Sequence, residues 1–149
     1  MSDEPLQLRH VTRENIDSIL ALKVRENQTA FVSSTAESLA YAYVYSETAW
    51  PFGIYHNEEP VGFIMLGYYE LKGYYTLWKL LIDKDHQHKG FGRKALRMGT
   101  AFLKERFGIS EIYTGVAIGN DTARQLYLSE GFRPTGLTEY CMEELCAKL

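Results

Sequence analysis

Apolar residues along this 149-residue chain follow two spacings, one typical of strands and one typical of helices. Near the start, apolar and polar residues first alternate, and apolar residues then recur every three or four positions. In the first part of the chain we expect a strand at Leu6, Leu8 and Val11, a helix over 14–22, a helix that Ser33 or Ser34 caps, and strands over 52–55, 61–69 and 74–82. In the second part we expect a helix over 93–107, a strand over 111–117, and a helix that Asn120 or Asp121 caps and that ends near Gly131. One or two closing strands follow from Phe132 onward.

Two of these strands, 52–55 and 61–69, are separated only by the turn residues 57–60, so they are expected to form a hairpin. The strand over 74–82 is apolar on both faces, as expected of a buried central strand. Hairpins beside helix crossovers favour an α/β (α+β) fold with a mixed sheet, in the order β-α-α-β-β-β-α-β-α-β(β). No repeat or linker divides the chain, so we expect residues 1–149 to form a single domain.

Composition narrows the class of protein. Apolar residues make up 46% and charged residues 23%, which is typical of a globular protein, and the net charge of −3 argues against a general nucleic-acid binder. The two cysteines, Cys141 and Cys146, make no disulfide framework and favour a reducing compartment. No apolar run approaches the ~20 residues of a membrane span, and the acidic start of the chain resembles no signal peptide. We therefore expect a cytoplasmic protein that contacts neither membrane nor nucleic acid.

The first chemical motif is a turn that carries two glycines, Gln87-His88-Lys89-Gly90-Phe91-Gly92. It lies between a predicted strand and a predicted helix, where unpaired helix N–H groups and the helix dipole favour an anion. Lys89, Arg93 and Lys94 flank it, which suits a pyrophosphate. The turn is neither a P-loop nor a dinucleotide-binding fingerprint, and similar turns also occur in loops that bind nothing.

The second motif lies about thirty residues further on, in the helix that begins near Asn120. Asn120 and Tyr127 are seven residues apart, hence two turns and nearly on one face. A tyrosine hydroxyl can donate a proton, although a tyrosine at this spacing is equally typical of a packed helix face.

Together, Gln-x-x-Gly-x-Gly after a strand and Asn-x-x-Ala-x-x-Leu-Tyr-x-x-x-Gly-Phe resemble the GNAT superfamily of acetyl-CoA-dependent N-acetyltransferases. Segments 52–55, 61–65 and 77–83 are similar to the bacterial spermine/spermidine acetyltransferases. The resemblance implies a twisted, mostly antiparallel sheet flanked by about four helices. It also implies that the following residues bind acetyl-CoA: Leu81, Ile82, Gln87, His88, Lys89, Gly90, Phe91, Gly92, Arg93, Lys94 and Asn120.

The chemistry implied by the resemblance is direct attack of a neutral amine on the thioester, with Tyr127 as the general acid. A protonated amine must first lose a proton, and relatives are thought to use a glutamate on the central strand or a water chain for this. That strand, 74–82, contains no Asp or Glu here. Glu70, at the end of the preceding strand, is a candidate base, although a solvated hairpin carboxylate is equally typical of that position.

The acceptor stays open at this point between a small polyamine, another small amine and a protein amino group. A non-catalytic acyl-CoA-binding sensor is a further alternative, and so is a homodimer for the assembly. A polyamine would suit the acidic and aromatic residues of the first two helices and their exit, among them Glu26, Glu37, Glu47 and Trp50. Tyr41, Tyr43 and Tyr45 alternate on a predicted helix, so they cannot all face one site. His86 and His88 lack the pattern of a metal site, and we expect no metal.

Overall fold

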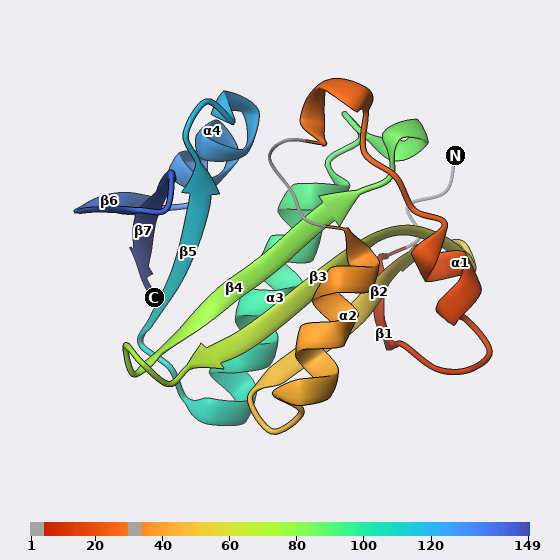
Figure 1. Ribbon diagram of the computed structural model, residues 1–149, viewed down its shortest axis with the longest axis horizontal. Helices are drawn as coiled ribbons and strands as arrows, with labels where there is room; N and C mark the ends of the chain where they lie inside the picture. The colour runs from red at the N-terminus through yellow and green to blue at the C-terminus, as the bar shows by residue number, and fades with distance from the viewer. Residues whose placement is uncertain (1–4, 30–33) are drawn as a thin grey trace.

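The computed structural model describes residues 5–29 and 34–149, and its elements follow the predicted order (Figure 1). The strands are β1 (Gln7–His10), β2 (Ala49–His56), β3 (Glu59–Tyr69), β4 (Tyr74–Ile82), β5 (Glu111–Ala117), β6 (Phe132–Glu139) and β7 (Met142–Lys148). The helices are α1 (Ile16–Leu20), α2 (Thr35–Val44), α3 (Phe91–Phe107) and α4 (Asp121–Ser129), with two short 3₁₀ helices, η1 (Glu26–Gln28) and η2 (Lys84–His86), that the sequence did not predict.

Helix caps account for several of these boundaries. The Ser34 hydroxyl accepts a hydrogen bond from the Glu37 N–H at 3.1 Å and caps α2, whereas Ser33 lies outside the described residues. Gly108 ends α3 at φ 64°, in the left-handed conformation expected of a C-terminal glycine. None of the helices in the described part of the chain is both long and apolar enough to cross a membrane.

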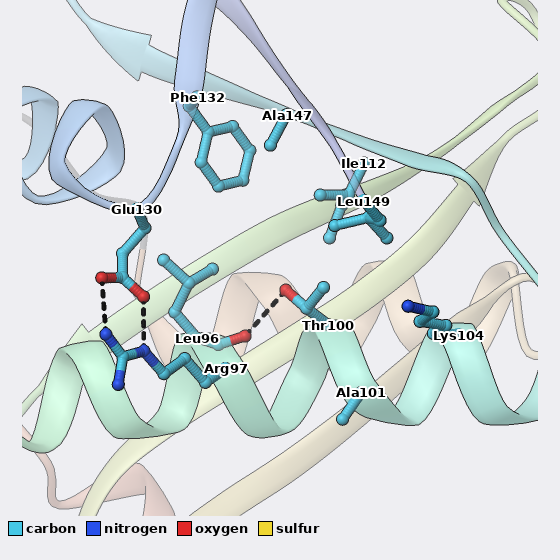
Figure 2. A pocket seen from close by; sticks show the side chains of 10 residues that line it. All are labelled: Leu96, Arg97, Thr100, Ala101, Lys104, Ile112, Glu130, Phe132, Ala147 and Leu149. Carbon is cyan, nitrogen blue, oxygen red and sulfur yellow. Dashed lines mark hydrogen bonds and ion pairs between the residues drawn. The ribbon is translucent and has the colours of Figure 1, made fainter.

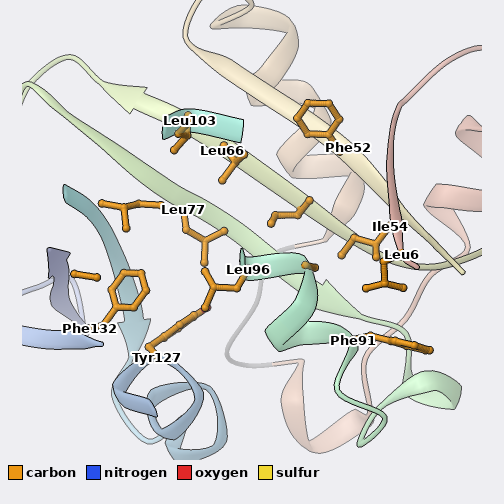
Figure 3. Packing of buried hydrophobic residues seen from close by; sticks show 14 of the residues in the cluster. Leu6, Phe52, Ile54, Leu66, Leu77, Phe91, Leu96, Leu103, Tyr127 and Phe132 are labelled. Carbon is orange, nitrogen blue, oxygen red and sulfur yellow. The ribbon is translucent and has the colours of Figure 1, made fainter. Parts of the chain in front are cut away.

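The strands form one seven-stranded sheet in the order β1-β2-β3-β4-β5-β7-β6, with helices on both faces. Every neighbouring pair is antiparallel except β4 and β5. On one face, Ile19 of α1 belongs to a buried cluster with Met65 and Leu81 of the sheet. On the other face, Leu96 of α3 and Tyr127 of α4 belong to a larger cluster (Figure 3). The predicted fold class, a mostly antiparallel mixed sheet flanked by helices, is confirmed.

Helix α3 packs closely against the sheet at Gly99. A Cβ atom on Gly99 would lie 2.9 Å from Ile64 Cδ1 of β3, so the missing side chain is what allows the approach. This packing fixes the start of α3 beside the end of β4, which is where the glycine turn connects them.

Strands β4 and β5 run side by side over only a short stretch. Their register joins Thr76 to Tyr113 and Leu77 to Thr114, and beyond these pairs the two strands diverge (Figure 1). The Thr114 hydroxyl donates to the Leu77 carbonyl at 3.0 Å and ties the strands together at the point of divergence. The prediction that β4 is buried on both faces is wrong for most of the strand, because only Thr76, Leu77 and Leu81 are buried and the other residues are half-buried.

A β-bulge lies at the same point of β4. Across β3, Leu77 pairs with Leu66 and Lys79 pairs with Met65, so Trp78 is the extra residue. Residues that pair directly share a face of the sheet, so Lys79 points to the same side as Met65, toward α2. The bulge thus brings Trp78 and Lys79 to the place where β4 loses its neighbour.

Candidate active site

The glycine turn leads from η2 into α3 through two residues with positive φ. His88 has φ 64° and Gly90, the residue before α3, has φ 81°. The first helical hydrogen bond runs from the Lys94 N–H to the Gly90 carbonyl at 3.2 Å, so the N–H groups of residues 91–93 have no helical partner. Among the residues that the structure describes, no side chain caps these groups, and the first turn of α3 holds no acidic residue. The turn therefore presents a set of donors suited to an anion.

The two glycines serve different purposes. A Cβ on Gly90 would meet nothing within 4 Å, so the backbone conformation and not space requires glycine there. A Cβ on Gly92 would lie 3.6 Å from Leu126 Cδ2 of α4 and 3.7 Å from Ile82 Cγ1 of β4. Gly92 therefore faces the region between α4 and the end of β4. Phe91 is buried, with its ring 4.9 Å from that of His56, and anchors the start of α3 in the core.

The three basic residues around the turn differ in their partners. Arg93 donates from Nη1 to Ser129 Oγ at 2.8 Å and to Glu130 Oε2 at 2.5 Å, so its guanidinium already ties α3 to the end of α4. Lys89 and Lys94 are exposed, and neither takes part in an ion pair among residues 5–29 and 34–149. The two lysines are therefore better placed than Arg93 to meet an incoming phosphate.

Gln87 positions the turn through its side chain. Its Nε2 donates to the Ile82 carbonyl at 3.0 Å and to Gln28 Oε1 at 2.9 Å, and Gln28 donates back to Gln87 Oε1 at 3.3 Å. The chain before η1 is held to the same place, because the Lys23 N–H donates to Asp83 Oδ1 at 3.0 Å. The Gln87 amide thus joins the end of β4 to η1, a link that the sequence motif did not suggest.

The free edge of β4 is formed by Leu80 and Ile82, not by Leu81. The Asp83 N–H donates to the Val61 carbonyl at 2.8 Å. In an antiparallel ladder, this bond makes Ile82 and Gly62 a non-hydrogen-bonded pair, so the backbone N–H and C=O of Ile82 point away from β3. Leu81 is consequently bonded to β3, and its side chain is buried against the α1 and α2 side. Of the two predicted pantetheine-pairing residues, only Ile82 offers a backbone group to the region that β5 leaves, namely its N–H, because its carbonyl already accepts from Gln87.

Helix α4 brings its two motif residues to the same region. The Asn120 side chain caps the helix by accepting from the Ala123 N–H at 3.4 Å. Tyr127, two turns on, is 7% exposed and packs 5.6 Å from the Phe132 ring (Figure 3). Its hydroxyl lies close enough to the Thr114 side chain to affect its pKa. Because Thr114 joins β4 to β5, the Tyr127 hydroxyl lies where these strands part. Burial raises the pKa of Tyr127 and Thr114 lowers it by a smaller amount, which together give a pKa of about 12. The phenol is therefore protonated at neutral pH.

Glu70 lies far from these residues. It is exposed and sits in the turn between β3 and β4, beside the pair Tyr69 and Tyr74. The glycine turn follows the other end of β4, beyond Ile82, and eight residues of strand separate the two ends by about 27 Å. The structure therefore does not bring Glu70 to the predicted site, because the turn of a hairpin and its open end lie at opposite ends of the two strands.

On the other side of β4, α2 presents an aromatic cluster. The Trp78 ring lies 6.2 Å from those of both Tyr41 and Tyr45, which stack 6.3 Å apart. Tyr41 and Tyr45 are about half exposed, and Tyr43 is 85% exposed and takes no part. As predicted, the three alternate tyrosines do not share one site. Glu37 lies one turn before Tyr41, so positions 37 and 41 of α2 and its C-cap Tyr45 form one stripe.

A cavity of about 310 Å³ lies elsewhere, between α3 and the strands β5, β6 and β7 (Figure 2). An ion pair between Arg97 and Glu130 closes one end of it. It is lined by Leu96, Arg97, Thr100, Ala101, Lys104, Ile112, Glu130, Phe132, Ala147 and Leu149. No residue of the glycine turn lines it, so this cavity is distinct from the anion-binding donors.

The histidines near the turn do not gather metal ligands. His86 Nε2 lies 3.5 Å from Glu59 Oε1, as a single pair. Within the part of the chain that the structure describes, no group of three or more His, Cys, Asp or Glu side chains is placed to hold a metal ion.

Solved structures share this fold over the full length of the chain. The PaiA N-acetyltransferase of Thermoplasma acidophilum in complex with coenzyme A superposes with a TM-score of 0.77 at 19% identity, and covers 100% of both chains. The spermidine N-acetyltransferase of Vibrio cholerae in complex with CoA and spermine superposes with a TM-score of 0.71 at 20% identity, over 95% of this chain and 92% of the other.

Sequence comparison defines the family. The model of the Acetyltransferase (GNAT) family matches residues 14–132. The chain is 30% identical to the spermine/spermidine N(1)-acetyltransferase of Bacillus subtilis strain 168, over 96% of this chain and 97% of the relative. A probable spermine N(1)-acetyltransferase of Bacillus subtilis subsp. natto is similar to the same extent. The chain therefore belongs to the GNAT family of acetyltransferases, which confirms the predicted resemblance.

Proposed function

We propose that this acetyltransferase moves the acetyl group of acetyl-CoA to a primary amine of a small polyamine, such as spermidine or spermine. One observation carries the proposal. Where β4 and β5 separate, the glycine turn at the start of α3 and Tyr127 of α4 reach the same opening. The spermine and spermidine acetyltransferases among the similar proteins support the choice of acceptor.

The residues present fit acetyl-CoA. The N–H groups of residues 91–93 would take the pyrophosphate, with Lys89 and Lys94 adding positive charge. The outward backbone groups of Leu80 and the outward N–H of Ile82 would pair with the pantetheine amides as an added strand would. The remaining predicted residues, Gln87, His88 and Arg93, would shape and brace the turn, while Asn120 would present its amide from the start of α4.

Acetyl-CoA supplies the activated acetyl group as a thioester. The neutral acceptor amine forms the new C–N bond directly, and the thiol leaves without a covalent enzyme intermediate. Tyr127 holds its proton at neutral pH because its pKa is about 12, so it is in the form that can protonate the leaving thiolate. An N–H group on the free edge of β4 would stabilise the oxyanion.

The acceptor would approach from the α2 side, opposite Tyr127. There the faces of Tyr41, Tyr45 and Trp78 can attract an ammonium group, and the Glu37 carboxylate lies in the same stripe. An extended polyamine has several ammonium groups, so one can rest on the aromatic cluster while another end reacts.

Two measurements on the purified protein test this proposal. Titration with acetyl-CoA should show binding, and addition of spermidine should then release one thiol for each acetylated amine. Binding of acetyl-CoA without thiol release on any amine would show a sensor instead of an enzyme that acetylates amines. Absence of acetyl-CoA binding would contradict the assignment of the glycine turn.

A further inference from the structure

Lys79 is the one charged residue in β4, the strand that lacks any Asp or Glu. It follows the bulged Trp78 and lies two residues beyond Leu77, where β4 and β5 are last paired. The side chain is half-buried, and no ion pair among the described residues involves it. A half-buried lysine without an ion-pair partner is unusual, because lysine side chains normally keep their ammonium groups in water.

The position of Lys79 relative to Tyr127 is set by the two faces of the sheet. Lys79 points to the α2 face, where Met65 and Leu81 form the apolar floor. Tyr127 reaches the junction of β4 and β5 from the opposite, α3 and α4, face. The two side chains therefore approach the opening between the strands from its two sides, as a base for the acceptor and an acid for the leaving group should.

The surroundings of Lys79 favour its neutral form more than water does. Burial lowers the pKa of Lys79, and the Glu37 carboxylate on α2 opposes this in part. Tyr41 and Tyr45 lie on the same stripe of α2 as Glu37, while β3 contributes the uncharged Met65. The lowered pKa leaves a larger fraction of Lys79 as the uncharged amine than in water, and that is the form able to accept a proton.

We propose that Lys79 is the general base that deprotonates the acceptor amine. This inference rests on the proposed function. The uncharged Lys79 amine takes one proton from the acceptor ammonium, which leaves the nucleophilic amine. As the C–N bond forms and the C–S bond breaks, Tyr127 gives its proton to the thiolate and recovers one from the new amide nitrogen. Lys79 then releases its proton to water, so each turnover yields one amide, one thiol and one proton.

The test compares Lys79→Met, Lys79→Arg and wild type in a thiol-release assay with spermidine, from neutral pH to about pH 10. Both variants should lose about 10²-fold or more of kcat at neutral pH while binding acetyl-CoA as wild type does. The loss should shrink as the pH approaches the ~10.4 of an alkylammonium, because the acceptor then deprotonates without help. Lys104→Met, which changes an exposed lysine of α3, should keep wild-type turnover.

Glu37→Gln adds a second readout that does not remove the base. Because Glu37 raises the pKa of Lys79, its removal should move the rising limb of the kcat profile to lower pH. Full activity of Lys79→Arg, unchanged turnover of Lys79→Met, or an unmoved limb in Glu37→Gln would overturn Lys79 as the base. A wild type that binds acetyl-CoA but acetylates no amine would instead overturn the proposed function, and the base with it.

Discussion

Replacement of Tyr127 by Phe tests the acid directly, because it removes one oxygen and keeps the ring. The ring still packs 5.6 Å from Phe132, so the change removes mainly the polar contact of the hydroxyl with Thr114, worth at most about 1 kcal/mol of stability. Loss of a general acid reduces turnover by about 10²–10⁴-fold, or roughly 2.7–5.4 kcal/mol of transition-state stabilisation. The effect on kcat should therefore far exceed the effect on folding.

The assay is steady-state thiol release, with acetyl-CoA affinity and thermal unfolding measured on the same samples. Affinity for acetyl-CoA should stay within about twofold, because the hydroxyl lies at the junction of β4 and β5 and not at the glycine turn. Tyr140→Phe is the matched control, since it removes the same atom from a tyrosine that is 95% exposed. Turnover of Tyr127→Phe within twofold of wild type would refute the role of Tyr127 as the acid.

The pKa of Tyr127 also makes a prediction about pH. Its folded-state pKa of about 12 lies above the ~10 of an exposed tyrosine, so the folded state binds the phenolic proton more tightly. Its contribution to stability is present below about pH 10 and is lost as the pH rises toward 12. In the same way, kcat should show no fall below pH 10 from ionisation of the acid.

Three further predictions concern the turn and its supports. Gly90→Ala should destabilise the protein by about 1–2 kcal/mol, because Gly90 has a φ of 81°, and it should also weaken acetyl-CoA binding. Gly108→Ala is the control, since it introduces the same strain at the other end of α3 and should lower only the melting temperature. Lys89→Ala combined with Lys94→Ala should weaken acetyl-CoA binding by about tenfold and reduce its salt dependence, which equilibrium titrations at two salt concentrations would measure. Arg93→Ala should act mainly on stability, because its guanidinium is bonded to Glu130. Glu130→Gln should lower stability at neutral pH, because Arg97 and Arg93 lower the pKa of Glu130. The deficit should shrink as the pH falls below the ~4.3 of an ordinary glutamate and the carboxylate is protonated, and an equal deficit at neutral and strongly acidic pH in urea unfolding would contradict this.

The order of strands and helices was predictable because it depends on local spacing. The alternation near Leu8, the cap at Ser34 and the left-handed Gly108 each act within a few residues. The glycine turn was predictable for the same reason, since Gly90 takes its φ of 81° from the adjoining helix start. Local rules also predicted that Tyr41, Tyr43 and Tyr45 cannot all face one site, because helix geometry decides which side chains share a face.

Features that depend on pairing between distant segments were not predictable. The divergence of β4 from β5 follows from which residues pair after a long crossover, and it leaves Ile82 but not Leu81 with a backbone N–H that faces away from β3. The distance of Glu70 from the turn follows from the direction of the β3–β4 hairpin. The engagement of Arg93 by Glu130 needs the packing of α4 on α3. No single-position rule in the sequence signals any of these.

The central claim is that a polyamine is the acetyl acceptor, and a comparison of kcat/KM across amines tests it most directly. Spermidine, spermine, putrescine and a lysine peptide would be compared with acetyl-CoA in a thiol-release assay, with the acetylated product identified by mass. We predict that spermidine or spermine has the highest kcat/KM and that the lysine peptide is at least tenfold lower. A lysine peptide that equals or exceeds the polyamines would contradict the account.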